Sequence, residues 1–313
     1  MDPIISDSLP ASPLLRLPFE IRLMIYEYLL LPSTTPSAGD GTSVANLVPD
    51  SSFHTYYSDD TNNDPFTLSV RTIDPWMGSQ GSRMWRRRST FHIRTGPFLT
   101  TTTPTTYCVL LSPYTAHLRH TIPSLLPLCQ QIQAEASKIL YSNYNFSFHT
   151  SIEAIVPFLS DLTPTSRSHV RHLSLTKKAL PYTKEFDRAE WSRVCDFLAA
   201  PQVSLQSLHL HVVAGKPDAG YQAIVPIEGR DFDVMLRLRK EWLGGGADTG
   251  GVDLEWVEQL LRIGGLREVR VRALVERCAR AVSEKQAFWV AFSRGVVEGA
   301  FGEWVRGRMV GPV

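Results

Sequence analysis

Histidine is the residue type in this chain best suited to acid–base or metal chemistry, and six of the nine histidines occur in close pairs. The pairs are His117 with His120, His169 with His172, and His209 with His211. The first two pairs are spaced to share a helix face, and the third pair shares one face of a strand. A zinc site needs at least three protein ligands, and no third ligand is evident near any pair. We therefore expect satisfied or solvent-facing histidines and no metal.

Other patterns that could support catalysis are incomplete. Asp59, Asp60 and Asp64 resemble part of a calcium loop, but the sequence lacks the regular spacing of oxygen ligands and the closing Glu. The tract GGGADTGG (244–251) is not followed by the Lys-Ser/Thr of a phosphate loop, which favours a linker. Neither GxSxG nor HExxH occurs. We predict a non-catalytic protein without a cofactor; a pocket that joins the third histidine pair with a carboxylate would favour an enzyme instead.

The run RMWRRR (83–88) is the one concentrated basic patch. It could contact phosphate or act as a nuclear import signal, but a solvated turn before the next strand is the simpler interpretation. The whole chain has 32 basic and 31 acidic residues, a net charge of +1. Because proteins that bind duplexes usually carry a strongly basic surface, we predict no nucleic-acid partner.

The composition is that of a globular protein, with 43% hydrophobic and 20% charged residues in 313. The cysteines lie far apart, at Cys108, Cys129, Cys195 and Cys278, which predicts buried thiols in a reducing compartment rather than a zinc or redox site. The N-terminus lacks the features of a secretory signal, and no apolar run is long enough to span a membrane. We expect a cytoplasmic or nuclear protein with no membrane partner.

Four segments follow one another along the chain. An N-terminal helix (1–32) precedes a loop rich in Ser, Thr, Pro, Gly and Asp (33–65), which we expect to be flexible. A β-rich insertion (66–123) follows, and then an α/β part (124–313). In the insertion, β-branched and aromatic residues predict strands at 66–72, 89–95 and 106–112, with the Thr-rich stretch 100–106 as a hinge.

The α/β part contains an internal repeat. VRHLSL (170–175), LQSLHL (205–210) and LREVRV (266–271) each follow a stretch of helical character. The helical stretches are 151–162, 186–200 and 253–264. Strand alternation places Leu173 with Leu175, Leu208 with Leu210, and Val269 with Val271 on one face. Helices between successive strands favour parallel pairing, and with YNFSF (144–148) as the leading strand the units resemble degenerate leucine-rich repeats. An ordinary small α/β sheet is the alternative.

Three further helices are expected around this array. Apolar spacing predicts one helix at 124–141, an additional helix at 231–243, and a closing helix at 283–306. Glycines inside the closing helix weaken that last prediction, because each lowers helix propensity by about 1 kcal/mol. The predicted fold class is therefore α/β, or mixed α+β, with an N-terminal helix ahead of a short parallel sheet.

The opening segment LLRLPFEIRLMIYEYLLLP (14–32) predicts an amphipathic helix. Its broad apolar stripe consists of Leu17, Ile21, Met24, Ile25, Tyr28 and Leu29. Pro18 suits the first helical turn, and Arg22 and Glu27 fall on the predicted outer face. Such a stripe is either core for the chain itself or a surface for another protein.

This segment resembles the first helix of F-box domains, whose hallmark is Leu-Pro followed by Glu-Ile and an apolar stripe. Together with LPLCQQIQAEASKILYSNYNFSF (126–148), it is similar to a group of fungal F-box-like proteins of unknown function, which pair "LPxEIRxxIYxYLL" with "CRQIxxEAxxxLYxxNxFxF". The residues that match the second pattern are Cys129, Gln131, Ile132, Glu135, Ala136, Leu140, Tyr141, Asn143, Phe146 and Phe148. Gln130 stands where the group has Arg.

The resemblance implies a compact three-helix unit that docks onto the ubiquitin-ligase adaptor Skp1. Carried over residue by residue, Leu17, Pro18, Ile21 and Ile25 would be the positions that contact Skp1. The helix that resembles the last F-box helix lies far downstream, with predicted strands between. Either an insertion splits the F-box, or the helix survives as core packing and binds no adaptor.

The leading hypothesis is a non-catalytic F-box-like adaptor that recruits an unknown protein substrate to a cullin-type ubiquitin ligase. The alternative is a structural or interaction protein whose opening helix is buried as core and does not bind Skp1. The orientation of the Leu17, Ile21 and Ile25 stripe separates the two hypotheses, because it faces solvent in the first and the chain's own core in the second.

Overall fold

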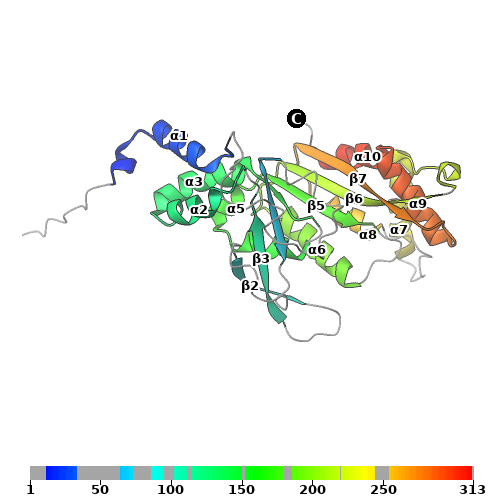
Figure 1. The fold of residues 1–313 in the computed structure, drawn as a ribbon. Coiled ribbons are helices and arrows are strands. Elements are labelled where there is room, and N and C mark those ends of the chain that lie inside the picture. Colours follow the sequence, from blue (N-terminus) through cyan, green and yellow to red (C-terminus); the bar gives the residue numbers. More distant parts are fainter. Residues whose placement is uncertain are drawn as a thin grey trace, which may run out of the picture.

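The computed structural model describes residues 12–33, 64–72, 86–94, 102–111, 114–149, 152–179, 185–218, 220–243 and 254–311 (Figure 1). The strands are β1 (Thr67–Thr72), β2 (Arg86–Arg94), β3 (Thr102–Leu110), β4 (Asn145–Ser147), β5 (His172–Lys178), β6 (Ser207–Pro217) and β7 (Glu268–Cys278). The α-helices are α1 (Phe19–Leu30), α2 (Leu118–Leu125), α3 (Gln130–Asn143), α4 (Ile155–Ser160), α5 (Pro164–Ser168), α6 (Glu185–Ala199), α7 (Gly229–Leu243), α8 (Glu255–Leu260), α9 (Glu284–Val297) and α10 (Ala300–Met309). Short 3₁₀ helices lie at Pro13–Arg16, Ile152–Ala154 and Tyr221–Ala223.

The strands form one seven-stranded sheet in the order β2-β3-β1-β4-β5-β6-β7. From β1 to β7 every neighbouring pair is parallel, whereas β3 pairs antiparallel with both β1 and β2. The predicted mixed α/β fold with an N-terminal helix is therefore confirmed, as is the parallel order of the repeated strands. The strands before residue 123 extend the same sheet, because β1 pairs directly with β4.

The repeated apolar positions lie side by side across the parallel strands. Leu173, Leu208 and Val269 occupy one row, and Phe146 and Leu68 continue it across β4 and β1. The next row holds Leu175, Leu210 and Val271. All but the half-buried Val271 are buried, so the alternation seen in the sequence does mark the core face.

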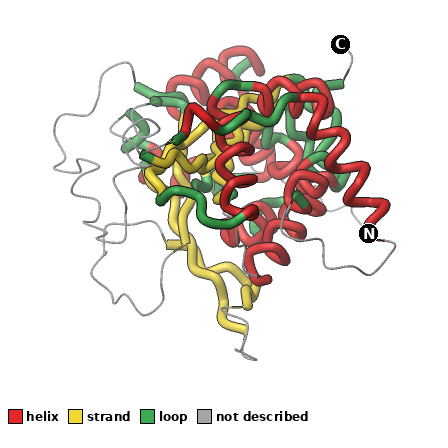
Figure 2. Tube along the Cα trace, turned by 90° about the vertical axis from the view of Figure 1, so that its right-hand side faces the viewer, coloured by secondary structure: helices red, strands yellow, loops and turns green. Residues whose placement is uncertain are grey.

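The helices cover this apolar face, so that sheet and helices form two layers (Figure 2). Near β7, an aromatic cluster fills the space between the layers. Its members are Phe232, Trp256, Phe292, Phe301 and Trp304, with neighbouring ring centroids 5.2–6.1 Å apart. Helix α10 approaches the sheet closely at Gly302, where an added Cβ would lie 3.3 Å from Cβ of Val271. These large side chains make one continuous core with the leucine rows.

The segment predicted as one helix at 124–141 forms two helices, so that prediction is wrong. α2 starts earlier, at Leu118, and ends at Leu125 before Pro127. Cys129 then adopts an extended backbone as the N-cap of α3, and its Sγ accepts a hydrogen bond from the Ile132 amide at 3.5 Å. Apolar spacing continues through this break, because both helices pack on the same core.

Two other predictions are also corrected. The closing helix is interrupted at Gly299, whose φ of 92° is a left-handed conformation that ends α9 and starts α10. Residues 102–106 of the expected Thr-rich hinge belong to β3, where threonine is a favourable strand residue. The helix predicted at 151–162 is the 3₁₀ turn plus α4, and α6 and α7 match their expected segments closely. The helix predicted at 253–264 is shorter than expected, because α8 covers only Glu255–Leu260.

Candidate protein-docking site on the first helix

Helix α1 packs against α2 and α3, which follow it in sequence only after three strands (Figure 1). The two ends of the intervening segment meet at the base of this three-helix unit. The Ser33 amide donates a hydrogen bond to the Tyr114 carbonyl at 3.0 Å, and the Ser33 hydroxyl donates to the same oxygen at 3.2 Å. The two ends of segment 33–114 are therefore adjacent, and the segment connects the first and second helices of the unit.

A buried ion pair joins α1 to α3. The Arg22 guanidinium donates to both carboxylate oxygens of Glu135, from Nε at 2.9 Å and from Nη2 at 2.7 Å. The same guanidinium caps the preceding turn by donating to the Leu17 carbonyl at 2.7 Å. Tyr26 and Gln131 each donate a further hydrogen bond to Glu135. The apolar spacing predicted Arg22 on the outer face, but the residue is buried, which is tolerated because its donors are satisfied.

This cluster changes the acidity of its members. Hydrogen bonds from Arg22, with smaller contributions from Gln131 and Tyr26, lower the pKa of Glu135 to about 2. Burial and the adjacent Glu135 carboxylate raise the pKa of Tyr26 to about 12. Glu135 is therefore ionised, and Tyr26 neutral, throughout the physiological pH range. We call this cluster the clamp: the Glu135 carboxylate is held by the Arg22 guanidinium and by two neutral donors, Tyr26 and Gln131.

The C-terminal end of α1 is held separately. Tyr144, which follows α3, is buried and donates its hydroxyl hydrogen to the Leu30 carbonyl at 2.7 Å. Leu30 itself is buried, and so is Tyr26 one turn earlier. Contacts at both ends thus fix the position and the rotation of α1, with Arg22, Tyr26 and Leu30 facing inward.

The opposite side of α1 is apolar and exposed. Ile21, Met24 and Tyr28 follow the 3-4 spacing of one helical face, and Leu17 lies in the extended segment just before α1. The exposed fractions of Leu17, Ile21, Met24 and Tyr28 are 37%, 43%, 64% and 87%. Of the other predicted contact positions, Pro18 is exposed and Ile25 is half-buried. The predicted stripe is therefore exposed in part: Ile21, Met24 and Tyr28 point to solvent, whereas Leu29 is half-buried and packs against the chain's own core. We call Leu17, Ile21, Met24 and Tyr28 the α1 stripe.

The structure places one of the three histidine pairs differently from the prediction. His117 precedes α2 and His120 lies in its first turn, but His169 ends α5 while His172 begins β5, so the second pair shares no helix face. Burial lowers the pKa of His117, His169, His172 and His209. His172 Nδ1 lies 2.7 Å from the Ser207 hydroxyl.

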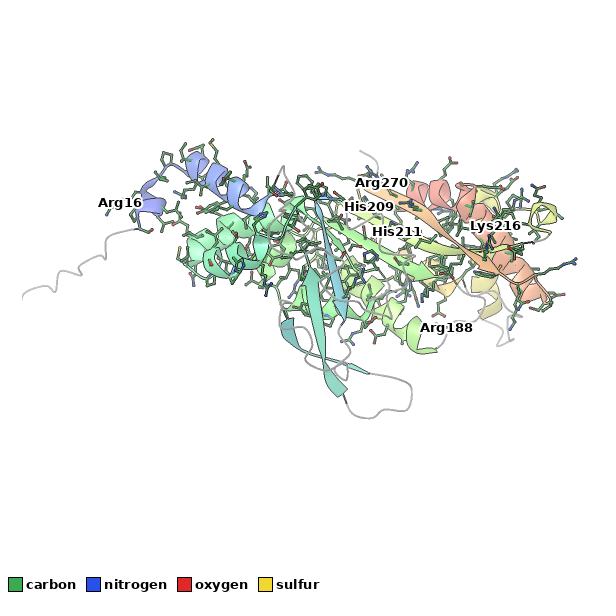
Figure 3. The ribbon with its side chains drawn as sticks, in the orientation of Figure 1. Arg16, Arg188, His209, His211, Lys216 and Arg270 are labelled. Atoms are coloured by element: carbon green, nitrogen blue, oxygen red, sulfur yellow. The ribbon has the colours of Figure 1, made fainter. Side chains whose placement is uncertain are left out.

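A polar sheet face is the feature that sequence reasoning missed. On the side away from the leucine rows, Ser147, Ser174, His209 and Arg270 form one row across β4–β7. Thr176, His211 and Arg272 form the next row. Figure 3 shows His209, His211 and Arg270 on these neighbouring strands. The same alternation that predicted the apolar rows predicts this face, once the strand register is known.

Possible metal-ligating side chains are dispersed in the described ranges. No group of three or more His, Cys, Asp or Glu side chains there could hold a metal ion. Cys195 is buried, whereas Cys129 and Cys278 are half-buried. Asp64 lies just before β1 and accepts hydrogen bonds from the Phe66 amide and the Thr67 hydroxyl.

Several sequence predictions lie outside the described residues. They are residues 34–63 of the expected flexible loop, with Asp59 and Asp60, residues 83–85 of the basic run, and the glycine linker 244–251. Residues 86–88 of the basic run start β2. Within the part of the chain that is described, no helix is both long and apolar enough to cross a bilayer.

Comparison with known proteins adds one match. Residues 87–228 match the family model described as Domain of unknown function (DUF7730). The matched stretch runs from β2 to the residue before α7, so it includes α2, α3 and the strands β3–β6 but neither α1 nor β7. No curated protein and no solved structure matches the chain.

Proposed function

We propose that the chain is a non-catalytic F-box-like protein whose α1 stripe docks onto a Skp1-type adaptor, and whose α/β part recruits a protein substrate for a cullin-type ubiquitin ligase. The observation that carries the proposal is the division of α1 into two faces. Arg22, Tyr26 and Leu30 hold the helix inward, and the α1 stripe remains exposed.

The energetics of this division favour a partner. Large apolar side chains gain roughly 1.5–3 kcal/mol each when they move from water into a packed interior. A chain that needed α1 only for its own core would turn this stripe inward, yet the ion-paired Arg22, with Tyr26 and Leu30, occupies that side. A standard protein interface buries roughly 1,600 Å² in total and depends on a few central apolar anchors. Ile21 and Met24 are the central anchors in this proposal.

The arrangement of the helices supports the split form of the F-box-like unit. The sequence resemblance relates α1 to the first F-box helix and α3 to the last one, and α1, α2 and α3 pack together. The hydrogen bonds between Ser33 and Tyr114 close the segment between them. A long insertion can therefore separate the helices in sequence without separating them in space. We also propose that the chain is related to the fungal F-box-like proteins that its two motifs resemble.

We assign substrate recruitment to the α/β part. Stacked βα units present an extended surface along their strands. On β7, Arg270 and Arg272 of the polar sheet face are exposed, and the half-buried His209 and His211 lie beside them. The substrate of this proposal is a protein of unknown identity.

The test is reconstitution of the full chain with purified Skp1. We expect one stable complex on size exclusion, and we expect Ile21→Asp to weaken its affinity by at least about tenfold, because a carboxylate would be desolvated in the interface. Val282→Asp is the matched control, since Val282 is an apolar residue that is 87% exposed and lies just before α9, far from α1 in the sequence.

The variants must keep the thermal unfolding transition of the parent chain. Failure of the parent chain to bind Skp1 would overturn the proposal, as would undiminished binding of a folded Ile21→Asp chain. If Ile21→Asp unfolds while Val282→Asp does not, the stripe is core, and the structural alternative replaces the adaptor proposal.

A further inference from the structure

β7 is the last strand of the sheet, and no described strand pairs with its outer edge (Figure 1). An isolated bridge between Leu266 and Val310 covers the edge just before the strand begins. Helix α10 lies beside the first half of β7, because Gly302 packs on Val271 and the Met309 carbonyl accepts a hydrogen bond from the Leu266 amide. The second half of the strand continues past these contacts and leaves an open edge.

The backbone of β7 presents hydrogen-bonding groups to this edge at alternate residues. The Glu268 amide donates to the Gln206 carbonyl just before β6, so the even-numbered residues of β7 point their amides and carbonyls into the sheet. The odd-numbered residues from Val269 to Arg277 point theirs outward. Val269 agrees with this alternation, since its carbonyl accepts a hydrogen bond from Arg306 Nε of α10 at 3.4 Å. Such a row of groups is a template for another strand.

The side chains of β7 are complementary to a second, antiparallel copy of the same strand. A two-fold axis at Ala273 places each residue opposite the one that is equally far from Ala273 on the partner strand. Arg270 then faces the partner's Glu276, and Val271 faces the partner's Val275. Opposite charges and β-branched pairs at directly facing positions both stabilise a sheet. Ala273 faces its own copy across the axis.

The charges also exclude the neighbouring registers. With outward-pointing residues on the axis, the next registers are centred on Val271 or on Val275. These registers place Arg270 opposite Arg272 or opposite Arg280. Like charges that face each other directly destabilise a strand pair, so the register centred on Ala273 is favoured over both.

Helix α10 is compatible with this register. The helix accompanies only the first half of β7, so the two copies of α10 lie on opposite sides of the axis. The antiparallel partner brings its second half, with Val275, beside the half that α10 accompanies. Val275 is 46% exposed in the single chain, and pairing places it next to the half-buried Val271 of the other copy. The exposed apolar position of the edge is thereby covered.

We propose that the chain forms a symmetric homodimer in which two copies of β7 pair antiparallel and continue one sheet across the two-fold axis. Arg270, whose Nε lies 2.5 Å from a carboxylate oxygen of Glu268 in the single chain, then stands between Glu268 and the partner's Glu276. The closed pairing removes the open strand edge from solvent. The dimer does not rest on the adaptor proposal, since it uses no residue of the α1 stripe.

The first test is sedimentation equilibrium of the full chain. We expect a dimer at about 100 µM that dissociates towards the monomer on dilution. A chain that remains monomeric at this concentration would overturn the proposal.

Proline on the axis tests the strand pairing itself. Ala273→Pro removes the outward amide at the centre of the pair, and an edge strand tolerates proline where the amide faces away from the sheet. We expect dimerisation to weaken at least about tenfold, with the thermal unfolding transition retained. Ala281→Pro makes the same change in the connection between β7 and α9, and we expect it to dimerise within about twofold of the parent. Equal dimerisation by a folded Ala273→Pro chain would contradict the pairing.

Exchange of charges tests the register, and it carries the test alone if Ala273→Pro does not fold. Arg270→Glu and Glu276→Arg each place like charges opposite one another, and we expect each to weaken dimerisation at least about tenfold. The double variant restores opposite charges and should return to within about threefold of the parent. Arg267→Glu is the control, because it reverses an exposed charge just before the strand. Single variants that match the parent, or a double variant as weak as either single, would overturn the register and the proposal.

Ile21→Asp separates this interface from the α1 stripe, which is a second exposed apolar surface. We expect the folded Ile21→Asp chain to dimerise within about twofold of the parent. Loss of the dimer in this variant would place the contact on α1 and overturn the pairing of β7. Skp1 binding by Ala273→Pro is expected to equal that of the parent, so the failure of one proposal is distinguishable from the failure of the other.

Discussion

Arg22 and Glu135 show how a charged pair can replace apolar packing between two helices. Both side chains are nearly covered, with 9% and 13% exposed, and each uses more than one hydrogen-bonding atom. A buried pair of this kind contributes orientation more than net stability, because desolvation offsets much of the attraction. Its effect here is to fix which side of α1 points outward.

The stabilising effect of Glu135 depends on pH in a predictable direction. Its pKa falls from an ordinary value of 4.5 to about 2 on folding, so the stabilisation is complete above pH 4.5 and is lost as the pH falls through 2. We expect the parent chain to have a higher thermal midpoint than Glu135→Gln at pH 6, and the difference to shrink steadily between pH 4.5 and 2. A difference that stays constant from pH 6 to pH 2 would contradict this account of the clamp.

The hydrogen bond between Tyr144 and Leu30 offers a second test at a single atom. Tyr144→Phe removes the hydroxyl that satisfies the buried Leu30 carbonyl, and we expect a loss of about 1 kcal/mol in the free energy of unfolding. Tyr28→Phe removes the same atom from an exposed position of α1, and we expect no measurable change. Denaturant titration of both variants gives the comparison; equal losses would mean that the bond to Leu30 does not hold α1.

At the scale of elements, a break between two helices determines which part of the sheet each helix contacts. α9 and α10 read as one helix in the sequence, but they pack on different parts of the sheet. α9 lies beside β6, where the Ser293 hydroxyl accepts a hydrogen bond from the Gly215 amide, while α10 crosses β7 at Gly302. The left-handed turn at Gly299 makes this change of direction.

Two glycines of this region are expected to respond in opposite ways to alanine. Gly299→Ala requires alanine to adopt a φ of 92°, where its Cβ is strained, and we expect a loss of about 1–2 kcal/mol in the free energy of unfolding. Gly307→Ala lies inside α10 with open space around the added Cβ, and we expect it to be neutral or to add up to about 1 kcal/mol. Urea unfolding midpoints measure both changes; a harmless Gly299→Ala would show that the turn does not need glycine.

For the molecule as a whole, stability is expected to be uneven. β6 lies inside the sheet, pairs with β5 and β7 over most of its length, and carries completely buried leucines. α1 has an exposed outer face and is attached through the clamp, Tyr144 and nearby side chains. Elements with fewer buried contacts open at lower free energy than the global unfolding.

Hydrogen exchange tests this difference. We expect the amides of α1 to exchange at least about tenfold faster than those of β6, and Arg22→Ala to accelerate α1 further without changing β6. Mass spectrometry on peptides from the full chain resolves the two elements. If Arg22→Ala accelerates β6 to the same extent as α1, the helix does not undock separately and the clamp supports the whole fold.

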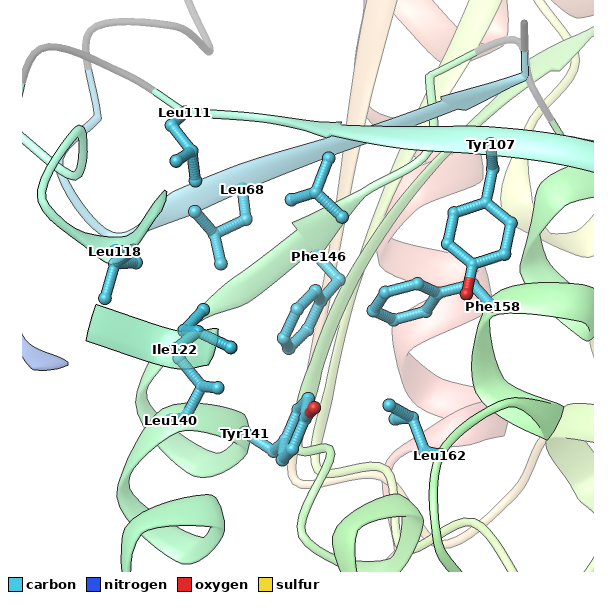
Figure 4. Close-up of a pocket in the computed structure, with 11 residues that line it drawn as sticks. Leu68, Tyr107, Leu111, Leu118, Ile122, Leu140, Tyr141, Phe146, Phe158 and Leu162 are labelled. Atoms are coloured by element: carbon cyan, nitrogen blue, oxygen red, sulfur yellow. The ribbon is translucent and has the colours of Figure 1, made fainter. Parts of the chain in front are cut away.

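The sequence predicted the features whose cause is local or periodic. Leu208 and Leu210 alternate within a single strand, so their shared face follows from the sequence, and so does the α1 stripe. Arg22 was misplaced because its partner Glu135 lies 113 residues away, and no local pattern connects the two. The row of Ser174, His209 and Arg270 likewise depends on strand register between distant segments. The packing of α2 and α3 on β1 and β4 also joins segments that lie far apart in the sequence, and no single segment specifies it (Figure 4).

The separation between Arg22 and Glu135 also has a consequence during synthesis. α1 leaves the ribosome 113 residues before the carboxylate that holds it. At about 5–20 residues per second, the interval is on the order of ten seconds. Throughout that time the helix has neither its own α3 nor its final orientation, so both its inner side, with Tyr26 and Leu30, and its outer stripe are open to nascent-chain chaperones. The newborn segment is thus accessible to other proteins before the rest of its own chain exists.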